Sequence, residues 1–150
     1  MLQLLKTDSS NTDFKLLVQL LDADLAKRDG DDHQFYAQFN YIDAIKHVIV
    51  AYVNNIPVAC GAFKPYTDTA VEIKRMYVAE TYRGQGFAQK VLAALEQWAA
   101  VLNNTSCVLE TGKKQPEAIA LYQKAGYTQI KNYGQYEHVE NSVCMEKKIG

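Results

Sequence analysis

The sequence lacks the features of a membrane protein and of a small disulfide-stabilised protein. Its 150 residues contain three cysteines at wide spacings, and this odd number predicts no disulfide framework. No apolar run approaches the roughly 18 residues that span a bilayer, and the N-terminus lacks the basic start of a signal peptide. We therefore expect a cytoplasmic protein with no membrane partner, in which all three cysteines are small core residues.

An excess of charge of one sign is also missing, because 16 basic side chains stand against 17 acidic ones. A nucleic-acid-binding domain usually carries a clear excess of Lys and Arg, so we expect no nucleic-acid partner. The three histidines form no i, i+4 pair and have no Cys or carboxylate cluster at ligand spacing. We therefore expect no metal site.

The sequence has few prolines, no internal repeat and no linker-like stretch, which predicts one domain over residues 1–150. Hydrophobic periodicity indicates a mixture of strands and helices. Asn54-Asn55 between two β-branched runs predicts a hairpin turn, and Pro116 and Gly126 are suited to begin and end a helix. We expect strands at residues 1–6, 47–53, 56–64, 71–78, 107–109, 127–131 and 142–149, and helices at 14–28, 34–45, 87–102 and 116–125.

The segment most informative about function is the loop after strand 71–78, which reads Arg83-Gly84-Gln85-Gly86-Phe87-Ala88. Glycines let successive N–H groups converge at a helix N-terminus, where unpaired donors and the helix dipole favour a phosphate. A Walker loop would need a following Lys-Ser or Lys-Thr, and Gln89 stands where a Rossmann fingerprint needs a small residue. The loop therefore predicts a phosphate-carrying ligand held mostly by main chain, with a purely structural turn as the alternative.

This loop, set between a strand that carries R-M-Y-V and an amphipathic helix, resembles the acetyl-CoA motif of the GNAT superfamily of N-acetyltransferases, Q/R-x-x-G-x-G/A. Residues 118–127, A-I-A-L-Y-Q-K-A-G-Y, resemble the later A-x-x-L-Y-x-K-x-G-F/Y signature of the same superfamily. Both blocks and their spacing match together over about residues 71–127. The resemblance implies an α/β (α+β mixed sheet) fold, the GNAT acyl-CoA N-acyltransferase fold, with a central mixed sheet of about six to seven strands flanked by helices.

The resemblance also implies roles for individual residues. The amides of residues 83–88 would bind the pyrophosphate of acetyl-CoA, and the backbone of a bulged strand at Met76, Tyr77 and Val78 would pair with its pantetheine arm. Tyr122 matches the tyrosine that protonates the departing thiolate, and core packing is its alternative role. Glu72 is the first candidate for the base that takes the amine proton, and Glu110 is the second. For either, the alternative is an ion pair, with Lys74 or Arg75 beside Glu72.

The activity that the resemblance implies is transfer of the acetyl group of acetyl-CoA to a primary amine, by direct attack in a ternary complex. The amine belongs to a small molecule or to a protein, and residues 29–41 and 132–139 would select it because they lie outside both motifs. A covalent route through Cys60 or Cys107 is disfavoured, since neither has an electropositive neighbourhood in the sequence. The alternative function is a catalytically silent CoA-binding sensor or interaction module, and a homodimer stays open.

Overall fold

A computed structural model describes residues 1–29 and 44–150. Within these residues the fold is built on a sheet of seven strands. Their hydrogen-bonded order is β1-β2-β3-β4-β5-β7-β6. β4 pairs with β5 in parallel, whereas the pairs β1–β2, β2–β3, β5–β7 and β6–β7 are antiparallel. The expected mixed sheet is therefore confirmed, with these strands: β1 (Leu2–Thr7), β2 (His47–Val53), β3 (Ile56–Pro65), β4 (Ala70–Val78), β5 (Ser106–Gly112), β6 (Thr128–Ile130) and β7 (Ser142–Lys148).

The chain forms two compact units. The first comprises residues 1–64 and 74–95, and the second comprises residues 65–73 and 96–150. Three elements contribute to both: β3 by its last residue, β4, and the helix α3 (Phe87–Val101). The helix expected at residues 34–45 falls almost wholly outside the described part of the chain.

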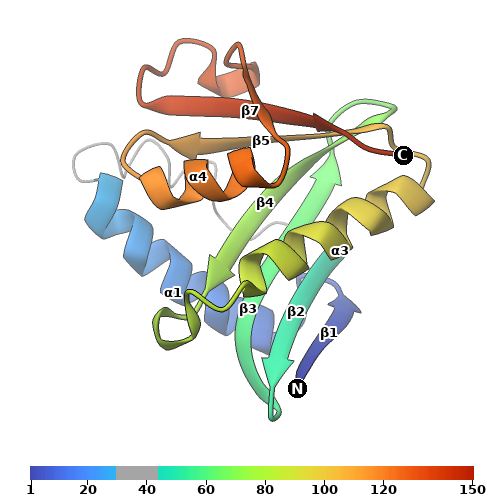
Figure 1. Cartoon of the computed structure of the whole chain (residues 1–150), viewed down its shortest axis with the longest axis vertical. Coiled ribbons are helices and arrows are strands. Elements are labelled where there is room, and N and C mark those ends of the chain that lie inside the picture. The colour runs from blue at the N-terminus through green and yellow to red at the C-terminus, as the bar shows by residue number, and fades with distance from the viewer. Residues whose placement is uncertain (30–43) are drawn as a thin grey trace. The chain divides into compact units, whose positions relative to one another are not determined.

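In the first unit, the helix α1 (Thr12–Asp29) covers one face of β2 and β3 (Figure 1). The helix begins two residues before the expected start at residue 14, and the side-chain oxygen of Asn11 accepts the backbone N–H of Phe14 at 2.9 Å and caps the first turn. Its apolar stripe is buried against alternate residues of the two strands. The members of this cluster are Phe14, Leu17, Val18, Ile45, Val48, Val50, Cys60 and Ala62.

The hairpin between β2 and β3 also forms as expected. Asn54 and Asn55 have φ of 51° and 65°, the positive values that a two-residue hairpin turn requires. Gly61 of β3 faces away from α1, and a Cβ placed on it would come within 2.5 Å of Met76 Sδ and 2.8 Å of Leu95 Cδ1. This glycine therefore allows β4 and α3 to pack closely on β3.

In the second unit, β5 lies between the start of β4 and β7, and the register aligns Glu72 with Val108 and Glu110 with Cys144. The strand expected at 107–109 is longer, since it pairs with β7 over its whole length. The helix α4 (Pro116–Lys124) begins at Pro116 and is followed by Gly126, whose φ is 102° (Figure 1). A 3-10 helix, η3 (Gly134–Tyr136), precedes β7.

The three cysteines confirm the expectation drawn from their number, since Cys60, Cys107 and Cys144 are free thiols and all are buried. Burial raises the pKa of Cys60 to about 12 and that of Cys107 and Cys144 to about 11. Among the described helices, none is long and apolar enough to cross a membrane.

Candidate active site

β4 is irregular at Arg75, whose φ of 60° lies in the left-handed region that non-glycine residues rarely adopt. A left-handed residue inside a strand interrupts the regular pleat, so β4 is irregular next to the residues for which the resemblance implied a bulge. The carbonyl of Arg75 accepts the Cys60 thiol at 3.3 Å, and its Nη1 donates to Asp22 of α1 at 3.0 Å. The strand then continues through Met76, Tyr77 and Val78, which are only half-buried. Sequence patterns alone do not reveal such an irregularity.

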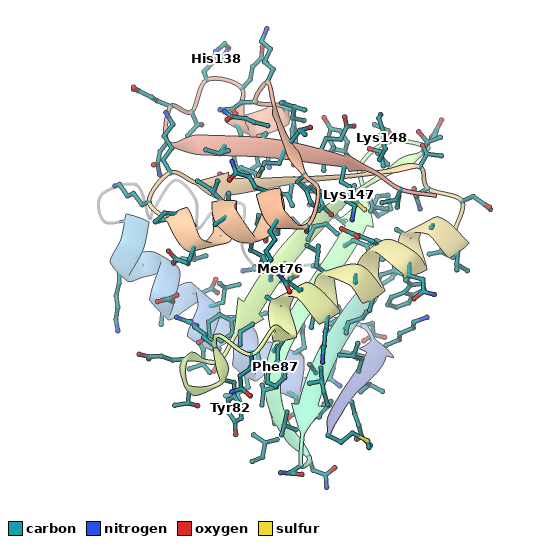
Figure 2. The ribbon with its side chains drawn as sticks, viewed as in Figure 1. Met76, Tyr82, Phe87, His138, Lys147 and Lys148 are labelled. Atoms are coloured by element: carbon teal, nitrogen blue, oxygen red, sulfur yellow. The ribbon has the colours of Figure 1, made fainter. Side chains whose placement is uncertain are left out.

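The loop after β4 leads through the 3-10 helix η2 (Glu80–Tyr82) to the first residue of α3, Phe87 (Figure 2). Gly84 and Gly86 both have φ of 81°, which other residues rarely adopt. Among the described atoms, a Cβ on Gly84 would meet nothing within 4 Å, and one on Gly86 would meet only Gln89 Oε1 at 4.0 Å. The first N–H groups of a helix have no acceptor within it, so this open loop has the properties of an anion cradle.

The side chain of Arg83 is held across the base of this loop. Its Nε donates to the carbonyl of Val78 at 2.9 Å, its Nη2 lies 3.6 Å from Asp24, and its guanidinium carbon lies 5.5 Å from the centre of the Tyr77 ring. These contacts orient a cation beside the glycines. Asp24 therefore offsets part of the Arg83 charge.

The second unit contains the two carboxylates expected to act as base. Glu72 is 5% exposed, and its Oε2 accepts the hydroxyl of Tyr133 at 2.7 Å. Glu110 is half-buried, and its Oε2 accepts the hydroxyl of Ser142 at 2.7 Å. The register places Glu72 beside Val108, two residues before Glu110, so both carboxylates lie on one face of the sheet.

The ion pair considered as the alternative for Glu72 does not form within the described chain. Arg75 pairs with Asp22, and no described basic side chain forms an ion pair with Glu72. The Tyr133 hydroxyl therefore contacts the Glu72 carboxylate, for which the sequence suggested Lys74 or Arg75 as partner.

Phenols surround these carboxylates. Burial, and then the charge of Glu110, raises the pKa of Tyr122, which is 7% exposed on α4. Burial followed by the charges of Glu110 and Glu72 raises the pKa of Tyr136 as well. The charges of Glu110 and Glu72 raise the pKa of Tyr136 and also that of Cys144. These four groups therefore form one electrostatic cluster. The cluster offers two proton acceptors beside phenols that stay protonated at neutral pH.

Several of these residues were not foreseen from the sequence in their present roles. Tyr133 and Tyr136 lie in the segment 132–139, which was expected to select the amine. Nothing in the sequence indicated the hydrogen bond from Tyr133 to Glu72, 61 positions away. Ser142 gave no signal at all. Glu137 and His138 of the same segment are exposed, and His138 lies on the outer side of the loop before β7 (Figure 2).

Three further points from the sequence concern the segment 29–41, metal ligands and the cysteines. Of the segment 29–41, residues 30–41 lie outside the described part of the chain. The described residues contain no group of three or more His, Cys, Asp or Glu side chains that could hold a metal ion. The protonated, buried thiols of Cys60 and Cys107 lack the thiolate that a covalent route requires.

Comparison with known proteins agrees with this geometry. The sequence profile of the acetyltransferase (GNAT) family matches residues 14–127. An IAA acetyltransferase from Azospirillum brasilense is 34% identical over 102 residues, covering 67% of this chain and 67% of that protein. The N-acetyltransferase YjgM of Escherichia coli is 35% identical over 107 residues, covering 67% of this chain and 62% of that protein. The chain thus spans about two thirds of the length of these curated relatives.

Solved structures extend the match to the whole chain. A Klebsiella pneumoniae protein assigned as an acyl-CoA N-acyltransferase superposes with a TM-score of 0.83 and 30% identity, covering 100% of this chain and 99% of that one. A PaiA N-acetyltransferase from Thermoplasma acidophilum, solved with coenzyme A, shares the fold with a TM-score of 0.76 and 13% identity over 99% of each chain. Since the profile covers most of the sequence and a solved relative covers all of it, this chain is an acetyltransferase of the GNAT family.

Proposed function

We propose that this protein is an N-acetyltransferase that transfers the acetyl group of acetyl-CoA to a primary amine by direct attack in a ternary complex. The observation that carries the proposal is the open glycine loop at the start of α3, with Gly84 and Gly86 at positive φ. Acyl-CoA is the cosubstrate of the GNAT family, and the Thermoplasma acidophilum relative was solved with coenzyme A. We propose that residues 1–150 form one domain.

The first unit would hold acetyl-CoA. The amides of the loop 83–88 suit a pyrophosphate, because they lie at a helix N-terminus and no described side chain covers the two glycines. The irregular residue Arg75 precedes Met76–Val78, whose backbone groups would pair with the pantetheine arm and polarise the thioester oxygen. Acetyl-CoA itself supplies an acetyl group activated as a thioester.

Tyr122 would protonate the departing thiolate. A thiol with an ordinary pKa of about 8.5 is a stronger acid than a phenol at about 10, so the transfer runs slightly uphill. Burial beside Glu110 raises the pKa of Tyr122 further, which keeps the phenol protonated. The same burial and charge would also destabilise a thiolate placed beside it, so the gap between the two groups stays small.

Glu72 would take the proton from the amine, directly or through water, and Glu110 is the second candidate. An amine is protonated near neutral pH and must lose a proton before it attacks. Glu72 is the more deeply buried of the two, and Tyr133 occupies one of its two oxygens, while no described cation neutralises it. The segment 132–139, which contacts this carboxylate through Tyr133, would select the amine, of a small molecule or of a protein.

The protein would act in the cytoplasm, as its three free thiols suggest.

We further propose that β1 forms a homodimer contact. β1 is the first strand in the sheet order, and its Leu4 and Leu5 are 41% and 44% exposed. In this contact the β1 strands of two copies would pair in an antiparallel direction, with the centre of the pairing between Leu4 and Leu5. Gln3 of one copy then lies opposite the partner's Lys6, so no two like charges face each other. A molar mass of one chain at all concentrations in light scattering would refute this contact.

The test of the proposed function is calorimetric titration with acetyl-CoA and with CoA, followed by an assay of thiol release on a panel of amines. Saturable binding with amine-dependent thiol release supports the enzyme. The protein's own thiols give a low background, because all three are buried with raised pKa values. Absence of binding contradicts the assignment of the loop 83–88.

The alternative is a sensor or interaction module that binds CoA without turnover. The loop 83–88 is compatible with both functions, whereas the cluster of Tyr122, Glu72 and Glu110 favours the enzyme. Binding without thiol release on the whole panel, in the presence of acetyl-CoA, would favour the sensor.

A further inference from the structure

We propose that Tyr133 is a positioning residue that orients Glu72 for proton removal from the amine, with the second carboxylate oxygen left to the substrate. This inference rests on the proposed function. Its basis is the single hydrogen bond from the Tyr133 hydroxyl to Glu72 Oε2, 2.7 Å long. A phenol donor leaves the charge on the carboxylate, whereas an ion pair would neutralise it.

The carboxylate depends on this one donor. Glu72 is 5% exposed. Among the described residues, Tyr133 is the one that donates a hydrogen bond to its carboxylate. A buried carboxylate without donors is strongly disfavoured, so the Tyr133 hydroxyl both stabilises the charge and selects the rotamer of Glu72. The other oxygen, Oε1, accepts no hydrogen bond from the described part of the chain and suits an amine or a bridging water.

Tyr133 is itself held in place by its neighbours. Its ring packs against Tyr66 at 4.9 Å and against Tyr136, edge to face, at 6.1 Å between centroids. Backbone N–H groups close successive turns around it, from Tyr136 to the carbonyl of Tyr133 at 2.9 Å and from Val139 to that of Tyr136 at 3.0 Å. The hydroxyl is therefore fixed before any substrate binds, as a positioning group requires.

The amide of Asn132 anchors the ends of this segment. Its Nδ2 donates to the carbonyls of Val139 and Ser142, each at 3.1 Å. The segment 132–142 thus forms a closed loop on β7, and this loop carries Tyr133 to β4. A loop that selects the amine would in this way also control the base.

Within residues 1–29 and 44–150, few titratable groups face Glu72 from the elements packed on it. They are Tyr133 and Tyr136 from the closed loop, Cys144 from β7, and Glu110 diagonally across the register on β5. Both tyrosines and the cysteine have raised pKa values and stay neutral near pH 7, so their state does not vary over the working range.

The test is a double-mutant cycle on kcat with Tyr133→Phe and Glu72→Gln. Tyr133→Phe keeps the ring and removes the hydroxyl, and we expect kcat to fall about tenfold while the affinity for CoA is unchanged. In the Glu72→Gln background the same substitution should change kcat by less than about twofold, since its effect acts through the carboxylate. Equal losses in both backgrounds, or an unchanged kcat for Tyr133→Phe alone, would overturn the proposal.

The pH profile is a second measurement, which stands even if Glu72→Gln is too slow to assay. With the same amine as substrate, the acidic limb of kcat should lie at higher pH in Tyr133→Phe than in the wild type, because the charged carboxylate loses its donor. A limb that does not move overturns the proposal. Tyr52→Phe is the matched control, since it removes another tyrosine–carboxylate bond of 2.7 Å, to Asp13 in the first unit, and should leave both kcat and the limb unchanged.

Failure of the proposed function gives a different result. Wild-type protein that releases no thiol with any amine contradicts the acetyltransferase activity itself, and the inference about Tyr133 with it. An active wild type whose double mutant shows additive losses contradicts the inference alone.

Discussion

Nη1 of Arg75 lies 3.0 Å from Oδ1 of Asp22, and this contact joins β4 to α1. The Arg75 side chain is 3% exposed, whereas that of Asp22 is 45% exposed, so a buried cation meets a partly solvated carboxylate. A buried charge that loses a partner costs more than an exposed ion pair contributes. The residue of β4 with positive φ is therefore tied by its side chain to the first helix.

Asp22→Ala should lower the free energy of unfolding by about 1–2 kcal/mol, because a buried guanidinium loses a charged acceptor. Urea denaturation measures this change. Asp24→Ala is the control, since its carboxylate lies 3.6 Å from the partly exposed Arg83 and its loss should cost less than about 0.5 kcal/mol. Equal effects of the two substitutions would show that the buried pair has no special role.

Gly86→Ala should weaken binding of acetyl-CoA at least tenfold, because an added methyl group and a changed φ disturb the amides that face the pyrophosphate. Calorimetry measures the affinity. Gly134→Ala is a matched control, with a positive φ of 54° and no described atom within 4 Å of the added Cβ. Both variants should lose similar stability, about 1–2 kcal/mol, and only Gly86→Ala should lose affinity. Unchanged affinity in Gly86→Ala would mean that the loop is a structural turn.

Tyr122→Phe should lower kcat about a hundredfold while the dissociation constant of CoA changes by less than about twofold. The reason is that only the proton donor is removed, and the ring stays in its buried site. Tyr127→Phe is the control, because Tyr127 packs edge to face on Tyr122 and bonds to Glu96 at 2.8 Å. That substitution should reduce stability without changing kcat. A parallel loss of kcat and CoA affinity in Tyr122→Phe would make Tyr122 a packing residue.

Stability should fall as the pH decreases through the titration of His47. Burial, and then the charge of Lys46, lowers the pKa of His47 below its ordinary 6.5, while its ring stacks on Phe63 with centroids 4.7 Å apart. The unfolded chain therefore binds the proton first, so stability is complete above about pH 6.5 and is lost as the pH falls through the folded-state pKa. His47→Phe keeps the stack and should flatten this slope between about pH 7.5 and about pH 5.5 in urea denaturation. Identical slopes in the two proteins would contradict the prediction.

Local sequence patterns were sufficient for most secondary structure and for the glycine loop at the start of α3. The Asn54-Asn55 turn and the glycine after α4 act over a few residues, so their signals are visible in a short window. The spacing of Gly84 and Gly86 before an amphipathic helix likewise indicated the anion cradle. These features depend on the backbone preferences of single residues, which hold in any tertiary context.

The partners of the site residues were decided by the tertiary structure. Glu72 accepts a bond from Tyr133, 61 positions away, and Arg75 pairs with Asp22, 53 positions away, whereas the sequence suggested an ion pair between neighbours. Adjacent residues of a strand point to opposite faces, and a bulge changes which face each residue occupies. Which side chains meet therefore depends on register and on the path of the closing loop, and no local pattern encodes either.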